Sequence, residues 1–402
     1  MKITFTTPLL LIAVVAALAA GCPAADGDTP DGGTEPDVNL PSDADMQAVV
    51  DTYADVVLAT YTDAHAEALD MQTAIEAFIA DPTEGNLSAA KTAWLNARNP
   101  YGETEVFRFY EGPIDFETDD ASGPEGQLNA WPMDELHVDY VEGNATAGII
   151  NNVADYPNIT LAVILGANGE GGEENVSTGY HAIEFLLWGQ DLAADGPGAR
   201  PATDYDTADN ADRRGEYLSI ITQLLVDDLA GLITEWEDGQ DNYRKTFVEL
   251  DPKDGITHML TGMGALSGFE LAGERIFVAY DSKLQEDEHS CFSDNTHNDV
   301  IRNAMGIRNV FMGSYGNTSG DSLYDLVGQV DSDLADDLKD ALDASVDAAE
   351  AIPVPFDQAI LGEDSDAGRT AVLATVEALE AQEAFIVDVA SLFDITLNLP
   401  EE

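Results

Sequence analysis

Most of the chain carries apolar residues at helical spacing. The clearest segment is 45–80, where the apolar positions recur every three or four residues: Val49, Val50, Tyr53, Val56, Val57 and Tyr61. The same spacing predicts helices over 86–97, 179–189, 213–236, 256–280, 299–311, 321–352 and 366–393, and shorter ones over 103–110 and 131–141. Two smaller apolar runs lie near 146–153 and 159–165. We find no convincing alternation of apolar and polar residues. The pattern therefore predicts an all-α protein.

A stretch rich in Pro, Gly, Ala and Asp over 191–211 interrupts the helical pattern near the middle of the chain. It predicts two helical-bundle domains, each resembling a four-helix bundle, over 43–205 and 206–402. The segment Gly268–Glu274 falls in the second half roughly where Gly179–Glu184 falls in the first. We therefore include an internal duplication as a hypothesis.

The first 22 residues have the pattern of an export signal. Lys2 gives a basic start, residues 9–20 are mostly apolar, and small residues precede Cys22. This ending resembles the lipobox of bacterial lipoproteins, although Leu18 stands one position earlier than usual. It predicts that Cys22 becomes the lipidated N-terminus of the mature protein; the alternative is ordinary secretion with cleavage near Ala20.

Residues 23–42, rich in Asp, Gly, Pro and Thr, predict a disordered acidic linker. We expect a lipid-anchored protein of the bacterial cell envelope, either periplasmic or on the outer-membrane surface, whose contact with the membrane is the N-terminal lipid.

With Cys22 lipidated, Cys291 would have no disulfide partner. Its surroundings favour a buried small residue over a nucleophile.

The chain is strongly acidic, with 16 basic and 77 acidic residues and a formal net charge of -61. Phosphate binding needs a basic face, so nucleic acid is excluded as a partner, and an anionic membrane surface is disfavoured. The charge is spread over the whole chain, which favours a solvated surface over a local field that concentrates cations.

One helical segment combines an apolar face with candidate chemistry. His181 and Glu184 lie three residues apart between Gly179 and Gly189, among apolar neighbours. Residues at this spacing share one face of a helix, so both side chains can reach one metal ion. The alternative is a structural hydrogen-bonded pair at the edge of the core.

Carboxylates elsewhere are candidates for the remaining metal ligands. Glu105 lies near Arg98 and Arg108, and Asp294 precedes Asn295 in a dense polar segment. Each also has a plainer interpretation: Glu105 and Arg108 have the spacing of a helical ion pair, and Asp294 suits a turn or helix cap. One histidine with carboxylates favours a hard or borderline metal ion such as iron, manganese or zinc.

Known zinc-protease motifs are absent. The chain has no H-E-x-x-H, and Phe185 stands where the inverted H-x-x-E-H motif needs its second histidine. A peptidase interpretation would therefore need further ligands from distant segments.

Four separated segments resemble the imelysin family. The G-x-H-x-x-E signature is Gly179-x-His181-x-x-Glu184. The other matching segments are 97–109 (Ala-Arg-x-Pro-Tyr, then Thr-Glu-x-Phe-Arg-Phe), 129–132 (Asn-Ala-Trp-Pro) and 292–297 (Phe-Ser-Asp-Asn-Thr-His), in the family's order. The resemblance is greatest to the iron-regulated, insulin-cleaving-protease-like imelysins. It implies an exported protein of two helical domains with a metal site between them, around His181 and Glu184. Family members are linked to iron uptake and are also classed as metallopeptidases.

Three hypotheses follow. In the first, the protein binds iron, or an iron-bearing ligand, for iron uptake, with a ligand set of His181, Glu184, Glu105 and Asp294, and with Arg98, Arg108 and Asn295 orienting the carboxylates. In the second, it is a zinc metallopeptidase in which Glu184 is a ligand or the general base. In the third, it is a structural surface lipoprotein. We prefer metal binding, and whether the chain is an enzyme stays open.

Overall fold

The computed structural model describes residues 40–118 and 121–400. The predicted signal peptide, Cys22 and most of the predicted linker lie outside the described residues. The helices are α1 (Asp43–Ala80), α2 (Glu84–Thr104), η1 (Glu105–Phe107), α3 (Glu125–Leu128), α4 (Glu135–Val138), α5 (Gly148–Asn151), α6 (Leu161–Ala167), α7 (Gly179–Trp188), η2 (Ala202–Tyr205), α8 (Ala211–Trp236), α9 (Tyr243–Val248), α10 (Pro252–Ala265), η3 (Leu266–Phe277), α11 (Val278–Ser282), η4 (Gln285–Asp287), α12 (Thr296–Met312), α13 (Leu323–Gly328), α14 (Ser332–Glu350), α15 (Phe356–Ala359) and α16 (Ala367–Leu392). Among the described residues the strands are β1 (Ser314–Tyr315) and β2 (Thr318–Ser319), which form one antiparallel hairpin.

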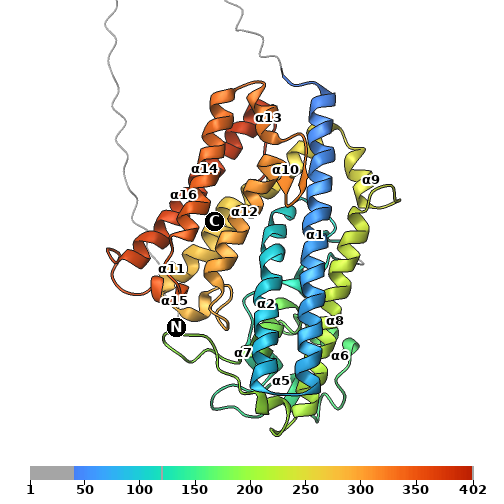
Figure 1. The fold of residues 1–402 in the computed structure, drawn as a ribbon, viewed down its shortest axis with the longest axis vertical. Helices are drawn as coiled ribbons and strands as arrows, with labels where there is room; N and C mark the ends of the chain where they lie inside the picture. Colours follow the sequence, from blue (N-terminus) through green and yellow to red (C-terminus); the bar gives the residue numbers. More distant parts are fainter. Residues whose placement is uncertain (1–39, 119–120, 401–402) are drawn as a thin grey trace, which may run out of the picture. The chain divides into compact units, whose positions relative to one another are not determined.

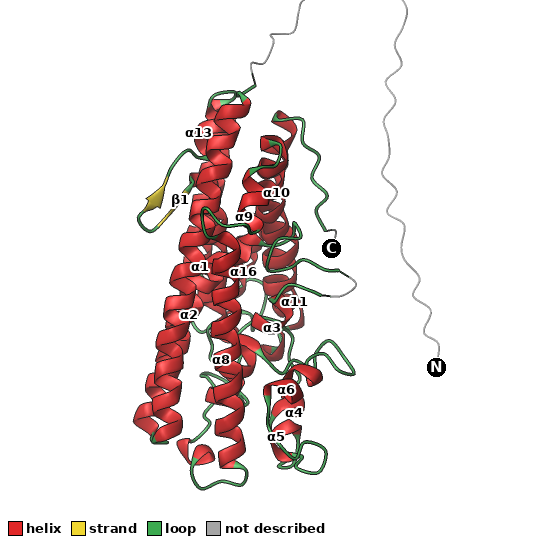
Figure 2. Cartoon of the chain, turned by 90° about the vertical axis from the view of Figure 1, so that its right-hand side faces the viewer, coloured by secondary structure: helices red, strands yellow, loops and turns green. Residues whose placement is uncertain are grey.

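The prediction of an all-α fold is confirmed. The long helices α1, α2 and α8 lie side by side, and α7 packs against α2 and α8 (Figures 1 and 2). A second group contains η3, α12, α14 and α16 (Figure 1).

Helix α8 is long and apolar enough to cross a membrane by length and composition, yet it packs along α1 and α7. The described residues, 40–118 and 121–400, belong to one compact unit, and the domain boundary near residue 205 and the duplication stay predictions.

Capping residues set several helix ends. Ser42 begins α1 with a capping box, in which its hydroxyl accepts from the Asp45 amide and the Asp45 carboxylate accepts from the Ser42 amide. Asp331 begins α14 by accepting from the Leu334 amide. The prediction of one helix over 321–352 is wrong, because Asp331 caps a new helix after α13 ends at Gly328.

Two further boundaries differ from the prediction. The break expected at 98–102 is absent: α2 continues through Pro100 to Thr104. Burial of Trp94, Ala97 and Tyr101 on the core outweighs the hydrogen bond that a proline removes from a helix interior. The helix expected over 131–141 covers only Glu135–Val138, where Asp134 accepts from the Leu136 amide as N-cap.

Close packing of α2 and α12 brings together the segments that build the site. A β-carbon at Gly306 of α12 would lie 2.7 Å from the carbonyl oxygen of Glu103 in α2, so a larger residue does not fit there. This approach places Arg98 of α2 against Asp299 in the first turn of α12.

Candidate metal centre

Helix α7 positions the two motif residues inside the protein. It begins at Gly179, whose φ is +83° and whose β-carbon, if present, would lie 2.5 Å from the Leu128 carbonyl oxygen. Both requirements restrict the position to glycine. His181 and Glu184 follow on one face of the helix, and both are fully buried. The glycine of the motif therefore fixes where the helix begins and seats it against the end of α3.

His181 has one anchored and one free ring nitrogen. Its Nδ1 lies 3.0 Å from Glu184 Oε2, within hydrogen-bond distance. Its Nε2 is buried and has no hydrogen-bond partner. Buried polar atoms are nearly always paired, so a free Nε2 requires an explanation. The ring centroid lies 4.8 Å from that of Trp131 and 4.8 Å from that of His289.

Glu184 is held on both sides. Its Oε1 accepts hydrogen bonds from the Ser293 amide at 2.9 Å and from the Ser293 hydroxyl at 2.6 Å. Burial raises the pKa of Glu184 to about 8, and burial together with His289 lowers the pKa of His181 well below its ordinary value. Burial thus disfavours the charged form of each group in this pair.

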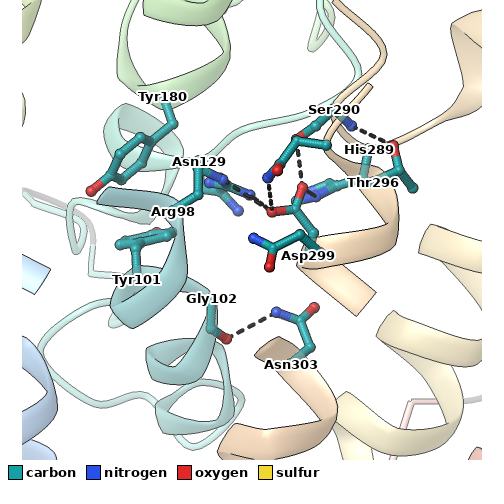
Figure 3. Close-up of polar contacts among 12 residues, drawn as sticks. Arg98, Tyr101, Gly102, Asn129, Tyr180, His289, Ser290, Thr296, Asp299 and Asn303 are labelled. Atoms are coloured by element: carbon teal, nitrogen blue, oxygen red, sulfur yellow. Dashed lines mark hydrogen bonds and ion pairs between the residues drawn. The ribbon is translucent and has the colours of Figure 1, made fainter. Parts of the chain in front are cut away.

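His289 has a similar arrangement. It lies in the loop before α12, and its Nδ1 is 3.1 Å from Asp299 Oδ2 (Figure 3). Burial and the neighbouring Arg275 lower the pKa of His289 to about 4, so the imidazole is neutral at physiological pH. Burial opposes the ionisation of Asp299, but Arg98 and the hydrogen bond from His289 outweigh it and lower its pKa. Sequence reasoning missed His289 and Asp299.

Arg98 and Asn295, which were predicted to orient carboxylates, both contact Asp299. The Arg98 Nη2 lies 3.1 Å and the Asn295 Nδ2 lies 3.2 Å from Asp299 Oδ1. Arg98 also donates to the Asn129 side chain at 2.6 Å, and in Figure 3 it reaches Asp299 from α2. These two residues therefore support the His289–Asp299 pair.

Glu105 belongs to a separate ion-pair network. Its Oε2 accepts from Arg108 at 2.9 Å and from Arg275 at 2.5 Å. Burial alone would raise the pKa of Glu105, but Arg275 and Arg108 lower it to about 2. The i,i+3 ion pair between Glu105 and Arg108, the plainer interpretation of the sequence, is present in the structure.

Asp294 lies among other carboxylates. Burial, followed by the charges of Asp191 and Asp357, raises its pKa to about 7. In residues 40–118 and 121–400, no group of three or more His, Cys, Asp or Glu side chains is arranged to hold a metal ion. The structure thus does not gather His181, Glu184, Glu105 and Asp294 around one point.

A cavity of about 470 Å³ opens beside the histidines. Trp131 and His289, the two rings that contact His181, both line it, together with Arg108, Arg275 and several carboxylates. His181 therefore lies directly behind the cavity wall. Because Nδ1 of His289 is hydrogen-bonded to Asp299, Nε2 is the ring nitrogen that remains available to other partners.

The fold and this centre define a class: an all-helical protein with two buried, neutral histidines, each hydrogen-bonded to a carboxylate. The family model described as imelysin, a peptidase family, matches residues 57–386. The chain belongs to the imelysin family.

Relatives agree with this assignment. Iron-regulated protein A of Synechococcus elongatus is 27% identical over 337 residues, which cover 81% of this chain and 80% of the relative. A solved structure of a protein described as an iron-regulated protein A precursor from Parabacteroides distasonis has a TM-score of 0.68 at 22% identity, covering 88% of this chain and 96% of that one. An imelysin-like protein from Psychrobacter arcticus has a TM-score of 0.63 at 13% identity, covering 89% and 98%. The two structures establish the shared fold.

Proposed function

We propose that this protein binds iron, as an ion or as an iron-bearing ligand, at His181, and that it serves iron uptake. Family membership and the name of the Synechococcus relative, iron-regulated protein A, support the link to iron. The observation that carries the proposal is the unpartnered Nε2 of His181, a buried nitrogen beside a cavity.

The residues present fit a metal ion. Neutral imidazole nitrogen is a good ligand for iron and zinc, and ligating histidines usually donate their other N–H to a carboxylate. His181 has this arrangement through Glu184, and Glu184 is itself fixed by Ser293. A bound metal would supply charge and open coordination positions, while the chain's own residues hold the imidazole in place.

The zinc-peptidase alternative is less well supported. A general base must reach a water molecule at the reacting centre. Both oxygens of Glu184 already have partners within the protein, and the side chain is fully buried. These contacts favour an orienting role for Glu184.

The place of action that we propose is the bacterial cell envelope. Cys22 would carry the lipid and residues 23–42 would form the tether, as the sequence pattern predicts. The relative from Parabacteroides distasonis is described as a precursor, which agrees with export.

Metal analysis of the purified protein after iron or zinc loading tests the site. We expect wild type to retain metal and His181→Ala to lose it. The matched control is His137→Ala, because His137 lies in α4 and its Nε2 bonds the Ala167 carbonyl oxygen. Equal metal content in wild type and His181→Ala would contradict the proposal and leave the structural-lipoprotein hypothesis. Hydrolysis of peptides by the zinc-loaded protein that depends on Glu184 would favour the peptidase instead.

A further inference from the structure

We propose that His289 is a second metal ligand, opposite His181, and that Asp299 is its positioning residue. This inference rests on the proposed function, since it names the donor set of the same site. It adds a ligand from a loop that the helix motif does not include.

The two histidines have matching surroundings. Each Nδ1 lies within hydrogen-bond distance of a carboxylate oxygen. The distance is 3.0 Å from His181 Nδ1 to Glu184 Oε2 and 3.1 Å from His289 Nδ1 to Asp299 Oδ2. The ring centroids are 4.8 Å apart and the ring planes are inclined at 77°. Nδ1 is therefore anchored in both rings. Nε2 of His181 is buried without a partner, and the His289 ring, whose other nitrogen is Nε2, lines the cavity.

Asp299 is fixed more firmly than a simple histidine partner requires. Its Oδ1 is contacted by Arg98 and Asn295. Its Oδ2 contacts the His289 ring and accepts from the Ser290 hydroxyl at 2.5 Å (Figure 3). Because the carboxylate is held from α2 and from the loop before α12, it fixes the plane of the His289 ring.

A two-histidine donor set changes the expected ion. Two imidazole nitrogens favour borderline divalent ions such as Fe²⁺, Co²⁺ and Zn²⁺ over hard ions that prefer oxygen. Since the described residues hold no third ligand in place, the remaining coordination positions would face the cavity of about 470 Å³. Water, or ligands that the ion brings with it, would fill them, and Glu184 would orient His181 without binding the metal.

Calorimetric titration of the full-length protein with Zn²⁺ tests this donor set, and Co²⁺ absorption spectra report the nitrogen ligands. We expect His181→Gln and His289→Gln each to weaken binding about 100-fold or more, and Asp299→Asn to weaken it about 10- to 100-fold, the usual effect of losing a partner of a ligand. Restoring a carboxylate with Asp299→Glu should recover part of the affinity. The control is His258→Gln, because the His258 ring is half-buried and stacks on Tyr110.

The outcomes separate the two proposals. If His181→Gln loses Zn²⁺ and His289→Gln keeps it, the second ligand is wrong and the proposed function survives. If both variants bind like wild type, the proposed function fails as well.

NMR of histidine-labelled wild type avoids any folding defect of the variants: of the six histidines, we expect Zn²⁺ to shift the Nε2 resonances of two. A shift of one alone would overturn the inference.

Discussion

Two buried polar clusters in this protein look alike in composition and differ in how their atoms are paired. In the first, Asp139 accepts from Arg200 and Arg214 on Oδ2, both at 2.7 Å, and from Arg214 and Asn151 on Oδ1, both at 3.0 Å. Burial opposes ionisation of Asp139, and the two arginines outweigh it and lower its pKa. Every lone-pair direction of this carboxylate is used inside the protein.

The histidine centre is different. Glu184 and Asp299 are bonded from both oxygens, yet Nε2 of His181 has no partner. A fully bonded buried carboxylate fixes the fold: Asp139, which follows α4, holds that region against α8. Arg200 Nε in the first cluster also lacks a partner, but an arginine N–H is only a donor and cannot bind a metal, whereas a neutral imidazole nitrogen can. Under the proposed function, the free nitrogen of the anchored His181 ring is available to a ligand that the chain does not supply.

The largest expected effect is on the Asp139 cluster. Asp139→Ala leaves Arg214 buried without its carboxylate and leaves Arg200 with Asp204 alone, and breaking such a group costs about 3–5 kcal/mol. Urea unfolding at pH 7 measures this loss of free energy. The folded fraction should still bind metal. A loss below about 1 kcal/mol would show that Asp139 does not act as a structural anchor.

A smaller effect, dependent on pH, is expected at Glu105. A pKa lowered from 4.5 to about 2 corresponds to roughly 3 kcal/mol of folding free energy. Because the pKa is lower in the folded protein, this stabilisation is present above pH 4.5 and is lost as the pH falls toward 2. Glu105→Gln should therefore be roughly 3 kcal/mol less stable than wild type at pH 7, and the difference should shrink steadily below pH 4.5.

Urea unfolding of both proteins across pH 3–7 measures that difference. A constant difference over the whole range would show that Glu105 contributes by packing and hydrogen bonding, with no contribution from its charge.

The smallest stability effect is expected at His181. The imidazole is neutral and makes one hydrogen bond in a fully buried place, so His181→Leu should change the free energy of unfolding by less than about 2 kcal/mol. The same variant should lose bound metal. If His181→Leu were as damaging to stability as Asp139→Ala, His181 would have a structural role like that of Asp139.

Local information was sufficient for much of the fold. Helical periodicity predicted α1, α8 and α16 closely, since a run of apolar residues at this spacing can bury one face only as a helix. It failed at Pro100, where burial of neighbouring side chains outweighs the local cost, and at Asp331, where a cap divides one apolar run into two helices. It also missed α9 and the hairpin at 314–319, which are too short for periodicity to reveal.

Sequence patterns alone predicted the family and the helical fold class. They also placed His181 beside Glu184, because a spacing of three residues puts both on one face of a helix. The surroundings of the two side chains depend on the tertiary structure. Ser293 bonds Glu184 across 109 positions of sequence, and Arg98 meets Asp299 across 201. Such contacts depend on how closely α2, α7 and α12 pack, which no local pattern encodes. For the same reason Glu105 also pairs with Arg275, 170 positions away, while His289, in a loop without periodicity, comes to face His181.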